Sequence, residues 1–146
     1  EERVNVITAA YSLVGEVGYF WGGKSTTIGK DPSWGNAEKV SAAGSPSTGT
    51  TRASGLDCSG FVTWAVINGY KDQGMQAAVG DGTSDQWEKA GVVSEADAQP
   101  GDLILYEGHV GIYMGDGKII NAMNEAQGIG VCSATYTNIV AVRRVL

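Results

Sequence analysis

Thiol and imidazole side chains, which can act as nucleophile and general base near neutral pH, are few in this chain of 146. There are two cysteines, Cys58 and Cys132, and one histidine, His109. A cysteine attacks a carbonyl as its thiolate, and a helix N-terminus or a nearby imidazolium lowers the thiol pKa from its ordinary value of about 8.5. A cysteine beside a histidine can therefore cleave an amide bond by acyl transfer. The spacing of the two cysteines alone leaves one disulfide or two thiols equally open.

Cys58 stands where the sequence predicts the start of a helix. Asp57 is a good N-cap residue, and an apolar run follows over residues 61–67. The unpaired amides of a helix start favour a thiolate and can bind the oxyanion that forms on attack. Ser59 and Gly60 are small, which leaves room for a substrate carbonyl. The alternative is an unreactive thiol, because buried cysteine usually acts as a small hydrophobic residue.

His109 opens a predicted strand over residues 109–114, and the next predicted strand covers residues 118–122. The segment between them, residues 115–117, is read as a three-residue hairpin loop. Side chains alternate along a strand, so this register places His109 and Asn121 on one face and diagonal to each other. An asparagine there can orient the imidazole toward a thiol, as the third member of a catalytic triad does.

That register pairs Met114 with Lys118 and depends on the length of the loop. A two-residue turn would shift the pairing by one residue and move Asn121 to the other face. Asn124 or Glu125 would then be the fallback as third residue.

Helical patterns come first in the chain and strand patterns second. Apolar residues at helical spacing predict a first helix that ends near Gly15 or Gly18; they are Val4, Ile7, Tyr11 and Val14. A capping box from Thr83 to Gln86 predicts a short helix over residues 87–90. The further expected strands cover residues 103–106 and 139–145. This order indicates an α+β fold with N-terminal helices packed on an antiparallel sheet.

Residues 24–56 are rich in Ser, Thr, Gly and Pro, and we expect a long loop with Trp34 as its anchor. A short helical turn is predicted near residues 37–40. Loops of this length inside a compact domain are uncommon and are often functional, and a disordered insertion is the alternative. The chain as a whole, residues 1–146, is predicted to be one domain with this inserted loop.

The net charge of −6 argues against a nucleic-acid partner and against binding to an anionic membrane surface. We find neither an apolar run long enough to span a membrane nor a signal peptide, as in a mature secreted domain. We expect no metal site, because one histidine and two separated cysteines lack ligand spacing. No cofactor is expected either.

The motifs taken together resemble the NlpC-type family of bacterial cell-wall cysteine peptidases, a compact papain-like group. The matching segments occur in family order, and only residues 24–56 stand where the family usually has a short link. They are residues 19–23, 57–62, 99–103, 109–115 and 119–122. The resemblance implies a domain of three helices and an antiparallel sheet, with the nucleophile at a helix start.

The resemblance also implies the site residues. The catalytic set is Cys58, His109 and Asn121, of which Asn121 falls where the family usually has a histidine. The implied substrate-binding residues are Tyr19, Trp21, Asp57 and Ser59. Tyr19 would lie beside the nucleophile and help to bind the oxyanion or substrate, and Asp57 and Ser59 would line the pocket for the amine side of the substrate.

Family members cut the peptide stems of peptidoglycan, usually between γ-D-glutamyl and a diamino acid. We therefore expect a bacterial cysteine endopeptidase that acts on the peptidoglycan stem peptide, extracellular or associated with the cell wall. It would be a monomeric domain of a larger secreted protein. The alternatives are a wall amidase or acyltransferase with the same Cys and His, an inactive relative that binds peptidoglycan, and a structural domain with a Cys58–Cys132 disulfide.

Overall fold

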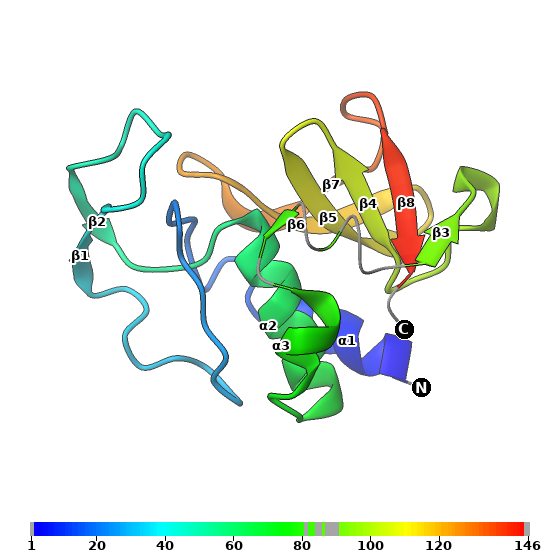
Figure 1. Ribbon diagram of the computed structural model, residues 1–146, viewed down its shortest axis with the longest axis horizontal. Coiled ribbons are helices and arrows are strands. Elements are labelled where there is room, and N and C mark those ends of the chain that lie inside the picture. The colour runs from blue at the N-terminus through cyan, green and yellow to red at the C-terminus, as the bar shows by residue number, and fades with distance from the viewer. Residues whose placement is uncertain (1, 81, 84–85, 87–90, 145–146) are drawn as a thin grey trace.

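The computed structural model describes residues 2–80, 82–83, 86 and 91–144, and Figure 1 shows how its elements are arranged. The helices are α1 (Glu2–Tyr11), α2 (Cys58–Tyr70) and α3 (Met75–Val79), with a 3-10 turn η1 (Glu95–Asp97). The strands are β1 (Ala37–Lys39), β2 (Thr51–Ala53), β3 (Gly91–Val93), β4 (Leu103–Tyr106), β5 (His109–Gly115), β6 (Lys118–Asn124), β7 (Gly128–Ser133) and β8 (Ala141–Arg144). Within these ranges, every helix is too short or too polar to cross a membrane.

The main sheet is antiparallel and, within the described ranges, has six strands in the order β3-β8-β4-β5-β6-β7. The helix α2 contacts α1 and also the strands β5 and β6. Figure 1 shows the helices gathered on one side of this sheet. The predicted α+β fold, with N-terminal helices on an antiparallel sheet, is confirmed.

The predicted strands are found as β4, β5, β6 and β8, with bounds shifted by a few residues in the last three. The strand β7 has no counterpart among the predictions. Its glycines, Gly128 and Gly130, interrupt the alternation of apolar and polar side chains that identifies a half-buried strand. The predicted helix over residues 87–90 and the middle of the predicted capping box lie outside the described residues.

The first helix is present but buries a different face from the one predicted. Val6 and Ala10 are fully buried, whereas Val4 and Tyr11 are 66% and 56% exposed. Both sets have helical spacing, so the sequence pattern alone could not choose between them. The choice is made by α2, where a Cβ on Gly69 would collide with Val6. The helix also ends earlier than predicted, before the glycines that follow it.

The two faces of the sheet carry separate clusters of buried side chains. Leu103 and Leu105 belong to the cluster under the helices, and Ile104 and Tyr106 belong to the cluster on the opposite face. This follows from the alternation of side chains along β4. His109 pairs with Tyr106, and it therefore shares the face that points away from α2.

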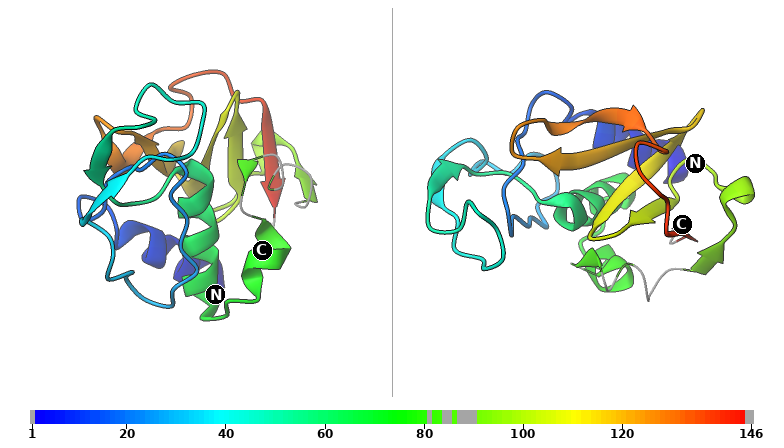
Figure 2. Two further views of the ribbon diagram at one scale, coloured as in Figure 1. Left: turned by 60° about the vertical axis from the view of Figure 1, so that its left-hand side comes forward. Right: turned by 90° about the horizontal axis from the view of Figure 1, so that it is seen from above.

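Residues 24–56 form a lobe that extends beyond the end of α2 (Figures 1 and 2). The lobe holds the antiparallel hairpin of β1 and β2, whose residues are all exposed. The helical turn predicted near residues 37–40 is therefore wrong, because backbone pairing with β2 decides the conformation of β1. Trp34 anchors the lobe as predicted, with its ring centroid 5.5 Å from that of Trp64 in α2.

Candidate active site

The site is built on the first turn of α2. Asp57 is the N-cap residue, and its Oδ1 accepts a hydrogen bond from the backbone amide of Gly60 at 2.7 Å. Cys58 is the first residue of the helix and is 9% exposed. A Cβ on Gly60 would collide with the carbonyl oxygen of Gly23, so this turn needs glycine at that position. The predicted N-cap is confirmed.

Burial raises the pKa of the Cys58 thiol above its ordinary value, and the charge of Asp57 raises it further. Hydrogen bonds from the backbone amides of Val110 and Ser59 and from the Thr83 hydroxyl act in the opposite direction without outweighing burial. Thr83 Oγ1 lies 3.9 Å from the Cys58 sulfur. The Ser59 amide at the helix start lowers the thiol pKa as expected, but burial outweighs it in the resting site. A neutral thiol needs a base before it can attack.

The ring of His109 lies among aromatic rings at the start of β5. Its centroid is 5.9 Å from the ring centroid of Tyr106 and 6.4 Å from that of Tyr136. Burial lowers the pKa of His109 below the ordinary value of 6.5. At neutral pH the imidazole is therefore uncharged and able to accept a proton.

The start of β5 reaches the start of α2 through the backbone next to His109. The backbone amide of Val110, the residue after His109, hydrogen bonds to the Cys58 sulfur. Burial and then the charges of Cys132 and Cys58 raise the pKa of Tyr136, whose ring also lies against His109. Cys58 and His109 are therefore linked through Val110 and have Tyr136 as a common neighbour.

The turn between β5 and β6 is tighter than predicted. Gly115 pairs with Lys118 across a two-residue turn whose φ angles are 54° and 72°, so the predicted pairing of Met114 with Lys118 is wrong. A β-bulge at Met114 absorbs the difference. Tyr113 consequently still pairs with Ile119, the register that the longer loop had implied.

The side chain of Asn121 contacts the ring of His109, with 3.0 Å between Nδ2 and Nε2. Asn121 is 1% exposed. Gly111 lies in the strand between them, and a Cβ there would collide with Cδ1 of Ile119 at 2.8 Å and lie 3.4 Å from the Cβ of Asn121. The predicted sharing of one face by His109 and Asn121 is confirmed.

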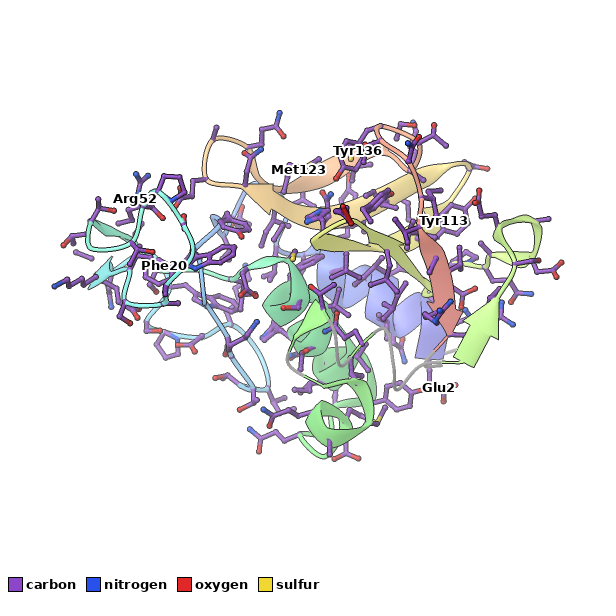
Figure 3. The ribbon with its side chains drawn as sticks, turned by 45° about the horizontal axis from the view of Figure 1, so that its top comes forward. Glu2, Phe20, Arg52, Tyr113, Met123 and Tyr136 are labelled. Carbon is purple, nitrogen blue, oxygen red and sulfur yellow. The ribbon has the colours of Figure 1, made fainter. Side chains whose placement is uncertain are left out.

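The two fallback residues are engaged in other contacts. Asn124 Oδ1 accepts hydrogen bonds at 2.8 and 3.1 Å from backbone amides of the turn that follows β6. Glu125 forms an ion pair with Arg52, with 3.6 Å between Oε2 and Nε. Met123 has its sulfur 3.9 Å from Nδ2 of Asn121. Figure 3 shows Met123 and Tyr136 along the same edge of the molecule.

The orientation of the Asn121 amide determines the tautomer of His109. An amide nitrogen only donates, so in the orientation with Nδ2 facing the ring, Nε2 accepts and the ring proton is on Nδ1. A half-turn of the amide would bring Oδ1 to the ring, where it would accept from Nε2–H and leave Nδ1 free. The second arrangement lets His109 take a proton from Cys58 at Nδ1.

Tyr19 and Trp21 come from one motif but lie in different surroundings. Burial raises the pKa of the Tyr19 hydroxyl, and the charges of Cys58 and Asp57 raise it further. Trp21 instead donates from its indole nitrogen to the carbonyl oxygen of Ala43 at 2.9 Å. The indole therefore holds the lobe of residues 24–56.

Asp57 and Ser59 already have a cationic partner in the chain. The ammonium of Lys24 lies 2.8 and 2.9 Å from the two carboxylate oxygens of Asp57. It lies 2.8 Å from the hydroxyl of Ser59. The predicted amine-side positions are thus brought together beside Cys58, and Lys24 occupies them.

Cys132 is half-buried on β7. Its sulfur lies 3.9 Å from Nδ2 of Asn121. Both cysteines are free thiols, which contradicts the alternative of a Cys58–Cys132 disulfide.

Sequence reasoning missed Lys24, Thr83, Tyr106 and Tyr136. Tyr106 could have been found, because only two residues separate it from His109 and a tight turn makes the two pair. Lys24 reaches Asp57 from 33 positions away in the chain and Thr83 reaches Cys58 from 25, and no local pattern connects residues so far apart.

A thiol at a helix start and an imidazole on an antiparallel sheet are the arrangement of papain-like cysteine hydrolases. The sequence profile of the NlpC/P60 family matches residues 16–143. The chain therefore belongs to the NlpC/P60 family.

Several known proteins are similar to the chain. Over 53% of its length it is 37% identical to peptidoglycan DL-endopeptidase CwlO of Bacillus licheniformis, of which it spans only 17%. The structure of the peptidoglycan hydrolase RipB from Mycobacterium tuberculosis superposes with a TM-score of 0.73 at 28% identity, covering 99% of this chain and 65% of that one. RipD from the same organism, a non-catalytic NlpC/p60 domain protein, matches with a TM-score of 0.73 at 22% identity, covering 100% of this chain and 98% of that one, and this likeness concerns the fold alone.

Proposed function

We propose that this domain is a cysteine endopeptidase that hydrolyses the stem peptides of peptidoglycan, at the bond between γ-D-glutamyl and a diamino acid. The observation that carries the proposal is the contact of 3.0 Å between His109 and Asn121, at the start of a strand whose next amide binds the Cys58 sulfur. Similarity to CwlO and RipB supports peptidoglycan as the substrate.

The proposed reaction begins with transfer of the Cys58 proton to His109. The thiolate then attacks the γ-carbonyl carbon, and the oxyanion forms next to the helix-start amides and the Tyr19 hydroxyl. His109 gives its proton to the departing amine as the carbon–nitrogen bond breaks. Water, deprotonated by His109, attacks the resulting thioester and releases the γ-carboxylate and the free thiol.

The resting protonation states suit this order of events. Burial leaves Cys58 as a thiol and His109 as a neutral imidazole. The pair can therefore begin catalysis only by a proton transfer within the site. Asn121 is the positioning residue, and it selects the reactive tautomer when its amide is turned so that Oδ1 accepts from Nε2–H.

Such a hydrolase would work outside the cytoplasm, in contact with the cell wall. The relatives' printed names, a DL-endopeptidase and a peptidoglycan hydrolase, support this location. We propose that residues 1–146 act as one catalytic domain whose inserted lobe, residues 24–56, borders the site through Trp21 and Lys24.

The non-catalytic alternative has a precedent in RipD, whose fold is shared. An inactive binding domain has no need for an oriented imidazole, and here Asn121 holds His109. An amidase or an acyltransferase could use the same Cys58 and His109, so the products must decide between these reactions.

The test is mass analysis of purified peptidoglycan digested by the wild-type protein, with Cys58→Ala as the blank. Release of L-Ala-γ-D-Glu fragments by the wild type alone supports the proposal. Release of intact stems would instead identify an amidase. A digest indistinguishable from the blank would refute hydrolysis altogether.

A further inference from the structure

Lys24 makes three polar contacts with the residues on either side of the proposed nucleophile. Its ammonium lies within 2.9 Å of both carboxylate oxygens of Asp57 and of the Ser59 hydroxyl. The carboxylate also caps α2 through Gly60, and a Cβ on Gly60 would lie 3.2 Å from the Lys24 side chain. The lysine stem therefore runs along the first turn of the helix and places its ammonium on the two residues that flank Cys58 in the sequence.

Asp57 is the charged group that faces the thiol. Among the described residues, it is the acid whose charge raises the pKa of Cys58. A carboxylate and a hydroxyl side by side on the rim of a site would ordinarily recruit an ammonium group from the substrate. In this chain the ammonium comes from Lys24, whose side chain is 36% exposed and so lies at the rim.

The position of His109 tells which part of the substrate meets Lys24. In the proposed reaction His109 protonates the leaving amine, so the leaving diamino acid lies on the side of β5. The acyl half of the peptide then lies on the other side of Cys58, toward Tyr19 and Lys24. The residue that precedes the D-glutamate is therefore the one that approaches the Lys24–Asp57 pair.

We propose that Lys24 is a specificity-determining residue that makes the site select stem peptides whose N-terminus is acylated over those with a free N-terminal amine. The inference rests on the proposed function and deepens it. A substrate ammonium would meet the ammonium of Lys24 and find the carboxylate already paired, whereas a neutral amide meets no such repulsion. The preferred substrate is then the stem still linked by an amide bond to its glycan strand.

The test uses two peptides that differ only in this group: L-Ala-γ-D-Glu-diamino acid and its N-acetyl form, each made with L-lysine and with meso-diaminopimelate. We expect wild-type kcat/KM to favour the acetylated peptide by about tenfold or more. In Lys24→Met, we expect this preference to fall by about tenfold through a gain on the free-amine peptide. Lys30→Met is the matched control, because Lys30 is exposed and pairs only loosely with Glu16 at 3.9 Å.

The ratio of the two peptides separates specificity from a structural role. If Lys24 merely held the fold, Lys24→Met would lower cleavage of both peptides together and leave the ratio unchanged, which would overturn the inference. A wild type that prefers the free amine would also overturn it. If Lys24→Met folds poorly, Lys24→Gln and the affinities of both peptides for a Cys58→Ala background give the same ratio.

Failure of the proposed function has a different signature. In that case the wild type cleaves neither the peptides nor intact peptidoglycan, and it matches Cys58→Ala in every digest. Cleavage of peptidoglycan with no discrimination between the two peptides would support the proposed endopeptidase and refute only the role of Lys24.

Discussion

The Nδ2 atom of Asn121 lies 3.0 Å from Nε2 of His109, although the turn between their strands has two residues and not the three that this register needs. The bulge at Met114 supplies the missing residue. Without it, the two-residue period of a strand would turn Asn121 to the other face of the sheet. One irregular residue in β5 is therefore a condition for the His109–Asn121 contact.

Asn121→Ala is expected to lower kcat/KM by about 10–100-fold, less than His109→Ala, which removes the base and should cost about 1000-fold or more. The reason is that Asn121 orients the ring and does not touch the scissile bond. Steady-state kinetics on one stem peptide measures both. The control is Asn124→Ala, at a residue that bonds only to the following turn, and a loss there as large as that of Asn121→Ala would assign the role to the wrong asparagine.

Cys58→Ala is expected to abolish hydrolysis while changing the free energy of unfolding by no more than about 1 kcal/mol, because little volume is removed. Denaturant unfolding and peptide digestion on the same preparation check the two halves of this statement. Cys132→Ala is the matched variant, and it should keep most of the activity. Loss of activity in Cys132→Ala with retention in Cys58→Ala would reverse the assignment of the nucleophile.

The pH profile of kcat/KM should show a broad plateau. Burial lowers the pKa of His109, so the acidic limb, where the base becomes protonated, is expected below the ordinary value of 6.5. Burial and the charge of Asp57 raise the pKa of Cys58, so the alkaline limb is expected above 9.0.

Thiol alkylation gives an independent reading of the same protonation states. Iodoacetamide should react with Cys58 slowly at pH 6 and increasingly fast above pH 9, following the thiolate. Fast alkylation at pH 6 would mean that the resting site holds a thiolate–imidazolium pair.

Asp102→Asn is expected to lower the free energy of unfolding by about 3 kcal/mol at neutral pH. The carboxylate is fully buried and bonds Arg144 at 2.8 and 2.9 Å and Arg3 at 3.0 Å, which ties α1 to β8. Urea unfolding measures the difference. Asp116→Asn, at an exposed turn residue with positive φ, makes the same change of charge and should stay within about 0.5 kcal/mol of the wild type.

The effect of Asp102 depends on pH in a definite direction. Burial alone would raise the pKa of this carboxyl, but hydrogen bonds from Arg144, the Gln99 amide and Arg3 outweigh it, so the pKa lies below its ordinary value of 3.8. A group with a depressed folded-state pKa stabilises the protein above its unfolded pKa and loses that contribution as the pH falls. The gap between wild type and Asp102→Asn should therefore be full above about pH 5 and shrink below pH 3.8.

Much of the fold was predictable because its signals are local. The cap at Asp57, the apolar run after Cys58 and the strands β4 to β6 each depend on residues a few positions apart. The face of α1 was not predictable, since two stripes shared the helical period and only contact with α2 favours Val6 over Val4. The strand β1 was mistaken for a helical turn because eleven residues separate it from its partner β2.

The sequence by itself singled out the proposed nucleophile, the proposed base and their proposed third partner, because cysteine and histidine are few in the chain and their motifs are short. Tertiary structure alone decided the charge state of the site and the surroundings of Asp57. Burial, which depends on the whole fold, raises the pKa of Cys58 although the helix-start amide of Ser59 lowers it, and burial also lowers the pKa of His109. Cys58 therefore stays protonated and His109 stays neutral. Packing of a distant segment brings the Lys24 ammonium onto Asp57, and no pattern in the sequence encodes a contact across 33 residues.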